Sequence, residues 1–116
     1  MRWIVAGGTI LANLALAAWA DTDWQKMSGV EISTALTEQT VVYESARQVF
    51  YASGRTLYTT SEDSWGTWAV RGDRYCSQWP PNADWACYEM YRMGETLKWT
   101  DTWGSESIGT LTVTPE

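Results

Sequence analysis

The pattern of hydrophobic and polar residues along this chain changes once, near Thr40. Before this point, Ile32, Ala35 and Leu36 follow the three-and-four spacing of an apolar helix face. After it, short runs rich in Val, Thr, Tyr and Trp alternate with clusters of turn residues, a pattern that is typical of β-strands. The sequence therefore predicts one short helix followed by a sheet.

The predicted helix has a well-marked beginning. Ser28 can cap it, and Glu31, three residues later, can complete a capping box. Met27 and Ile32 have the spacing of a hydrophobic staple. We expect a helix over residues 29–37, and its apolar face should plug or cover the sheet.

The residues between the predicted strands have the chemistry of tight turns. Ser53-Gly54, Gly72-Asp73 and Gly94-Glu95 can adopt positive backbone angles, and Pro80-Pro81-Asn82 makes a longer corner. Short connections favour antiparallel neighbours, because parallel strands need crossover segments. The expected fold class is mainly β (α+β), with the helix followed by an antiparallel meander that forms a curled sheet or a small barrel, since closure removes exposed edges. The eight predicted strands are residues 40–44, 47–52, 55–60, 65–71, 74–79, 85–92, 96–100 and 109–114.

The only two cysteines, Cys76 and Cys87, are predicted to form a disulfide. If the hairpin folds symmetrically about Pro81-Asn82, the two cysteines lie opposite each other. Their wide spacing differs from the C-x-x-C arrangement of redox-active pairs, so we expect a structural bond. The chain-entropy model gives it roughly 3 kcal/mol of stabilisation.

The first twenty residues have the pattern of an export signal. Residues 1–3 carry one positive charge, residues 4–16 form an apolar stretch, and Ala18-Trp19-Ala20 fits the small-x-small cleavage rule. The apolar stretch is shorter than the roughly 18–20 residues that span a bilayer. We therefore expect residues 21–116 to form a single small β-rich domain that is periplasmic or secreted, with no membrane span.

Charge and composition exclude several classes of function. After removal of residues 1–20, 7 basic and 14 acidic residues remain, and the resulting net charge of −7 repels nucleic acid and anionic lipid. The chain has no histidine, which excludes Ser-His and Cys-His nucleophiles and zinc sites with His ligands. With both cysteines paired, we expect no metal site and no cofactor.

Carboxylates are the groups left for acid and base catalysis. Two of them beside a Trp-rich cleft would resemble a glycosidase site. Glu31 is instead expected to be a capping residue, Asp101 and Glu106 are expected in the loop before the last strand, and most of the others fall in predicted turns. We therefore expect a non-enzymatic protein without catalytic residues, and keep a carboxylate-based glycan hydrolase as an alternative. The candidate carboxylates are Glu31, Glu62, Asp63, Asp73, Asp84, Glu89, Glu95, Asp101 and Glu106.

Tryptophan is the unusual component of the sequence. Trp68 and Trp99 are centred in predicted strands and are expected inside the fold. Trp79, Trp85 and Trp103 adjoin predicted loops and are the candidates for an exposed binding patch. Arginines on neighbouring strands that could lie over these rings are Arg71, Arg74 and Arg92.

Several short motifs occur together along the chain: Glu31-Ile32 in the predicted helix, a T-x-x-Y strand from Thr40 to Tyr43, a G-x-W at Gly66 to Trp68, and two cysteines around a hairpin. With the export signal, they resemble a group of small exported bacterial proteins of unknown function. This resemblance implies a periplasmic β-rich domain and brings no activity or site residues. The chain is also similar in size and export to small periplasmic β-barrel inhibitors of host lysozyme, although their inhibitory loop is not recognisable here.

These observations lead to three hypotheses of function. The first is a non-enzymatic binding or interaction module whose contact surface is the Trp79, Trp85 and Trp103 end, with a cell-envelope protein or glycan as partner. The second is an inhibitor of an envelope-directed hydrolase such as lysozyme, towards which the acidic charge would steer the protein. The third is the glycan hydrolase. Nucleic acid is not an expected partner, and the sequence carries no signal for the oligomeric state.

Overall fold

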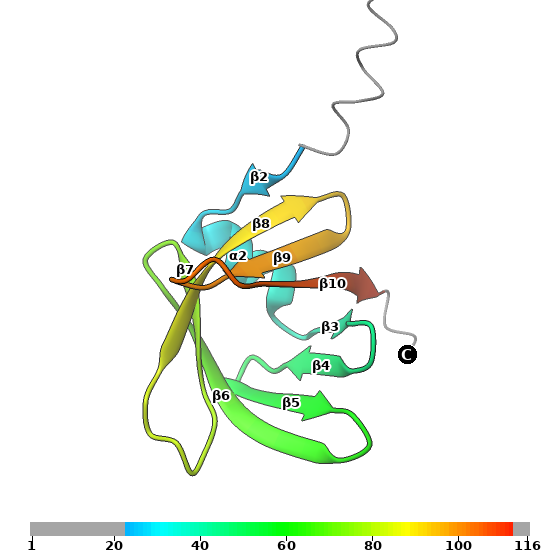
Figure 1. The fold of residues 1–116 in the computed structure, drawn as a ribbon, viewed down its shortest axis with the longest axis vertical. Helices are drawn as coiled ribbons and strands as arrows, with labels where there is room; N and C mark the ends of the chain where they lie inside the picture. The colour runs from blue at the N-terminus through cyan, green and yellow to red at the C-terminus, as the bar shows by residue number, and fades with distance from the viewer. Residues whose placement is uncertain (1–22, 113–116) are drawn as a thin grey trace, which may run out of the picture.

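The computed structural model describes residues 23–112, in which eight antiparallel strands form a β-barrel with a helix at one end (Figure 1). The predicted export signal lies outside the described residues, as do the last two residues of the predicted final strand. The elements are β2 (Gln25–Lys26), α2 (Gly29–Leu36), β3 (Gln39–Val42), β4 (Arg47–Phe50), β5 (Arg55–Thr59), β6 (Asp63–Arg71), β7 (Arg74–Gln78), β8 (Ala86–Met93), β9 (Thr96–Thr100) and β10 (Glu106–Thr112).

The barrel closes where its last strand meets its first. Each strand from β3 to β9 pairs antiparallel with the next one along the chain, and β10 pairs with both β9 and β3. In this last pairing, Leu111 lies opposite Val41, and Figure 1 shows β10 running between β9 and β3. The predicted meander is confirmed, and it is a closed barrel. The short strand β2, which was not predicted, pairs with the end of β8.

The predicted capping box is present at the start of α2. The Ser28 hydroxyl accepts from the Glu31 amide at 3.2 Å, and the Ser28 amide donates to the Glu31 carboxylate at 2.8 Å. The helix ends at Leu36, one residue earlier than predicted, and the hydroxyl of Thr37 donates to the Ser33 carbonyl. Both ends of the helix are therefore fixed by side chains close to it in sequence.

A contact with the sheet holds the helix at one end of the barrel. The Gly29 amide donates to the Asp73 carboxylate at 2.7 Å, and Asp73 lies in the turn between β6 and β7. The helix thus sits at the end where this turn lies, as expected for a plug. Within residues 23–112, no helix has both the length and the apolar character needed to cross a membrane.

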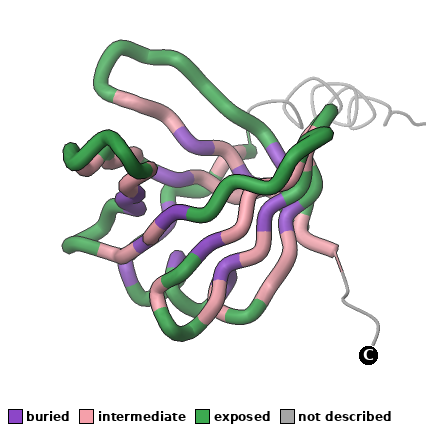
Figure 2. The backbone as a smooth tube through the Cα atoms, turned by 90° about the horizontal axis from the view of Figure 1, so that it is seen from below, coloured by how far each residue is buried: buried purple, intermediate pink, exposed green. Residues whose placement is uncertain are grey.

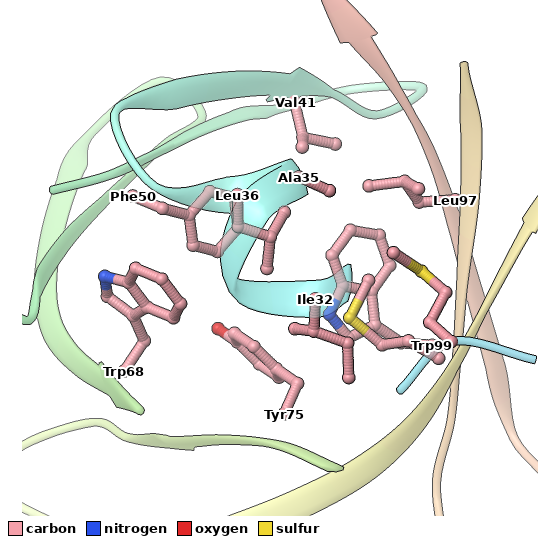
Figure 3. Packing of buried hydrophobic residues seen from close by; sticks show 11 residues of the cluster. Ile32, Ala35, Leu36, Val41, Phe50, Trp68, Tyr75, Leu97 and Trp99 are labelled. Carbon is pink, nitrogen blue, oxygen red and sulfur yellow. The ribbon is translucent and has the colours of Figure 1, made fainter. Parts of the chain in front are cut away.

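The core lies between the helix and the strands that surround it. Figure 3 shows the three apolar side chains of α2 among other buried residues: Leu36 lies beside Phe50, Ala35 lies on the side of Leu97, and Ile32 lies between Tyr75 and Trp99. The Phe50 ring meets the Trp68 ring edge to face, with centroids 5.6 Å apart, a favourable aromatic geometry. Figure 2 shows buried positions recurring along the strands, whereas the connecting loops are mostly exposed. The prediction that Trp68 is inside is confirmed.

The predicted disulfide between Cys76 and Cys87 is present, and the two residues face each other in the β7–β8 ladder. Tyr75, beside Cys76 in β7, belongs to the core, so alternation places the disulfide on the outer face of the sheet, where Cys76 is nevertheless fully buried. On the same face, the Arg71 guanidinium lies 4.2 Å from the centre of the Trp85 ring. This confirms one of the expected arginine–tryptophan stacks.

Two strands begin more than one residue before the predicted start. β10 begins at Glu106 rather than at residue 109, because residues 106–110 pair with residues 96–100 in a hairpin. Glu106 is therefore in the strand and not in the loop before it. β6 begins at Asp63 instead of at residue 65, since Asp63 pairs with Thr59. In both cases the added residues begin with polar ones, and they extend the strand because a partner strand is already alongside.

Candidate functional site

The two ends of the barrel differ. Four connections meet at the end away from α2: residues 43–46, 60–62, 79–85 and 101–105, which we call the open end. The interior near α2 is filled by the core, whereas a pocket of about 690 Å³ occupies the interior towards the open end. This pocket is the candidate site.

Six aromatic side chains line the pocket, and consecutive members of the set are in contact. The Trp79 ring meets Tyr58 at 6.1 Å between centroids, Tyr58 meets Tyr43 at 6.0 Å, and Tyr43 meets Trp99 at 5.7 Å. Trp99 meets Tyr75 at 6.1 Å, and Tyr75 meets Tyr88 at the same distance. All five pairs are tilted or edge-to-face, so the pocket presents rings at several orientations.

Two glycines leave room for this aromatic lining. A Cβ atom on Gly66 would lie 2.6 Å from Cε3 of Trp79, so only glycine lets the indole pack against β6. A Cβ atom on Gly109 would lie 3.0 Å from the Tyr43 ring. The glycines on β6 and β10 therefore leave space for the large rings of Trp79 and Tyr43, which directly follow β7 and β3.

A buried polar network forms the floor of the pocket. Gln48 is 5% exposed, and its amide oxygen accepts from the Tyr43 hydroxyl at 2.8 Å. Its amide nitrogen donates to the Thr56 hydroxyl at 2.9 Å and, more weakly, to the Tyr75 hydroxyl at 3.5 Å. Burial raises the pKa of Tyr75 to about 12 and also raises the pKa of Tyr43. Both phenols therefore stay protonated near neutral pH, and the floor is polar and uncharged.

Glu44, at the rim, is the one charged side chain among the described residues that line the pocket. The hydrolase hypothesis needs two carboxylates in one cleft, and this pocket has one. The nine candidate carboxylates do not line it; several hold structural contacts, such as Asp73 on the Gly29 amide and Glu95 with Arg92 at 3.3 Å. A second hollow of about 820 Å³ beside β2 has mainly charged and polar walls and lacks the aromatic lining.

The three predicted binding tryptophans all come from connections at the open end, but they point in different directions. Trp79 lines the pocket, and its indole N–H donates to the Ser77 hydroxyl at 3.2 Å. Trp85 lies on the outer face of the barrel beneath Arg71. Trp103 is 88% exposed in the β9–β10 connection. The structure therefore brings one of the three into the candidate site and leaves two outside it.

The connection that carries Trp103 is well ordered by hydrogen bonds. One carboxylate oxygen of Asp101 accepts from the amides of Trp103 and Ser105, at 2.8 and 2.9 Å. The Gly104 amide donates to the Asp101 carbonyl at 3.1 Å. An almost fully exposed indole is thus held on a braced turn.

Sequence reasoning missed most of the residues that line the pocket. Trp99 was assigned to the interior, and it is 4% exposed, but its place in a pocket wall was not anticipated. The cysteine register held a usable signal, because the same alignment places Tyr75 opposite Tyr88. Likewise, Gln48 lies opposite Tyr58 across β4 and β5. Tyrosines and a glutamine at inward positions near one end of a barrel indicate a polar cavity rather than a core.

Comparisons with protein-family models, with curated proteins and with solved structures found no match for this chain. The structure does contain the short helix, the antiparallel β-barrel and the single disulfide that the motifs suggested.

Proposed function

We propose that this protein is a non-enzymatic binding module that takes a small, uncharged ligand into the open end of its barrel. The observation that carries the proposal is the pocket of about 690 Å³, with six aromatic rings in its walls and buried hydrogen-bonding groups in its floor. Small-molecule sites are typically concave, about 300–1,000 Å³ in volume, rich in aromatic side chains and supplied with a few polar groups.

The arrangement of the barrel supports binding from one direction. The core and α2 fill the opposite end, so a ligand has its entrance between the four connections of the open end. The pocket walls are strands of a closed barrel, and one disulfide ties two of those strands together. A site of this kind is largely formed before the ligand arrives, which lowers the entropic cost of binding.

The proposed place of action is the periplasm or the extracellular space. Disulfides persist in oxidising compartments, so the Cys76–Cys87 bond supports export. The pattern of residues 1–20 and the resemblance to small exported bacterial proteins support the same location. A cell-envelope glycan, or a fragment of one, is the ligand source that fits this location.

Fluorescence titration tests the proposal, because two of the pocket residues are tryptophans. The full chain is titrated with the uncharged probe N-phenyl-1-naphthylamine and with neutral disaccharides. We expect saturable binding by at least one compound, weakened in Trp79→Phe and unchanged in the matched control Trp103→Phe. Binding that is lost in the Trp103 variant and kept in the Trp79 variant would place the site on the outer surface and contradict the proposal.

A second function, inhibition of an envelope-directed hydrolase, is favoured by one observation. Trp103 is 88% exposed on a turn that Asp101 braces, and exposed tryptophans are common energetic centres of protein interfaces. A lysozyme activity assay with micromolar protein tests this function. Inhibition that disappears in Trp103→Ala would support it, whereas full lysozyme activity in the presence of the unaltered protein would count against it.

A further inference from the structure

The Val49 carbonyl determines which groups donate and which accept in the hydrogen-bond network of the pocket floor. The Thr56 hydroxyl donates to the Val49 carbonyl at 2.8 Å, so its single proton is used there. Thr56 must then accept from the Gln48 side chain, which turns the NH₂ group of the amide towards Thr56. The Gln48 oxygen therefore faces Tyr43, and the Tyr43 hydroxyl is the donor.

This network leaves one acceptor free in the floor. The Tyr43 hydroxyl donates its one hydrogen bond to Gln48, and the lone pairs of its oxygen can still accept a hydrogen bond. The Tyr43 side chain is part of the pocket wall. The Tyr43 oxygen can therefore accept a hydrogen bond from a ligand in the pocket.

The same network leaves two hydroxyl donors free. The Tyr75 hydroxyl accepts from the Gln48 amide, and the Ser77 hydroxyl accepts from the Trp79 indole. Neither hydroxyl donates to another side chain or carbonyl among the described residues, so both protons remain for an acceptor, and both residues line the pocket. Tyr75 is only 4% exposed, so leaving its proton without a partner would be costly.

The remaining lining narrows the class of ligand. Nine of the fifteen described lining residues carry a hydroxyl group, and none of the fifteen is Lys or Arg. An anionic ligand would meet Glu44 at the rim and no cation within the described lining. A purely apolar ligand would remove water from several hydroxyls without replacing their hydrogen bonds, which is unfavourable for each buried hydroxyl.

We propose that the pocket binds a short neutral saccharide, whose hydroxyl groups pair with the free acceptor on Tyr43 and the free hydroxyl donors of Tyr75 and Ser77. The apolar C–H faces of the sugar ring would lie against the aromatic walls. Each sugar hydroxyl both donates and accepts, so it matches a floor that offers both an acceptor and donors. This inference rests on the proposed function, because it concerns the same pocket.

Calorimetric titration of the full chain with maltose, cellobiose and N,N′-diacetylchitobiose tests the inference, with N-phenyl-1-naphthylamine as an uncharged apolar probe. We expect at least one disaccharide to bind, with an affinity reduced tenfold or more in Tyr75→Phe and in Ser77→Ala. The matched control is Tyr51→Phe, whose ring stacks on Trp65 and does not line the pocket. Its affinity should stay within twofold, and melting temperatures confirm that each variant is folded.

The outcomes separate the two proposals. Binding of the apolar probe without binding of any disaccharide would overturn the saccharide inference and leave the proposed function standing. Disaccharide binding that Tyr75→Phe and Ser77→Ala both leave unchanged would overturn the role of the polar floor. If neither the probe nor any disaccharide binds, both proposals fail.

Discussion

Replacing Gly66 by alanine should destabilise the protein by driving the Trp79 indole out of its place. The new Cβ atom would lie 2.6 Å from Cε3 of Trp79 and 2.8 Å from the carbonyl oxygen of Gln78. That oxygen belongs to β7, whose residue 78 is paired with residue 67 of β6, so the backbone cannot retreat without disturbing the ladder. Both contacts therefore have a cost: the indole has to move, and the remaining contact with the Gln78 oxygen strains the ladder.

The size of the effect follows from the overlap. Overpacking by one methyl group in a well-packed interior typically costs 1–3 kcal/mol. For Gly66→Ala we expect a loss of about 2 kcal/mol in the free energy of unfolding, which lowers the melting temperature by on the order of 10 °C in a domain of this size. Urea denaturation followed by tryptophan emission measures the loss.

A double-mutant cycle assigns the loss to the indole. In a Trp79→Ala background, the Gly66→Ala change should cost about 1 kcal/mol less, because the ring that it meets is gone. Equal losses in both backgrounds would show that the cost arises from the backbone alone. No loss in the unaltered background would refute the close packing of Gly66 and Trp79.

Three further predictions concern stability. Replacing Cys76 and Cys87 together by alanine should lower the free energy of unfolding by about 3 kcal/mol, because the bond closes a short loop in the unfolded chain; a loss below 1 kcal/mol in urea denaturation would contradict this. Above pH 10 the protein should lose stability because of Tyr75. Burial raises the pKa of Tyr75 in the folded protein from 10.0 to about 12, whereas Tyr75 of the unfolded chain ionises near pH 10, so ionisation favours unfolding. This contribution is fully present below pH 10 and declines by at most roughly 3 kcal/mol as the pH rises to 12; Tyr75→Phe should show a shallower decline in pH-dependent unfolding. Ser28→Ala should cost about 1 kcal/mol by removing the helix cap, and the exposed Thr34→Ala on the same helix should change the melting temperature little.

Local features of the fold were predictable from the sequence, because their determinants are close together in the chain. The capping box of α2 needs only Ser28 and Glu31, and the register of the β7–β8 hairpin follows from its two cysteines. Barrel closure was one of two open alternatives, because it depends on pairing between β3 and β10, about 70 residues apart. No local pattern encodes that contact.

The candidate site was less predictable than the fold. Proximity to loops selected Trp79, Trp85 and Trp103, but the direction of each ring depends on tertiary neighbours. Trp79 turns inwards because Gly66 on another strand leaves space, and Trp85 lies outwards under Arg71. The pocket tyrosines escaped prediction because sequence alternation shows which face a residue occupies but not whether that face is filled.

Because α2 and the core fill one end of the barrel, the pocket is a chamber with one entrance and not a channel through the barrel. A long polymer cannot be threaded through such a chamber, so only a terminus, or a fragment already cut free, can reach the tyrosine hydroxyls inside. If the pocket binds a saccharide as proposed, the fraction of occupied pockets would depend on the concentration of polysaccharide ends and not on the total amount of polysaccharide.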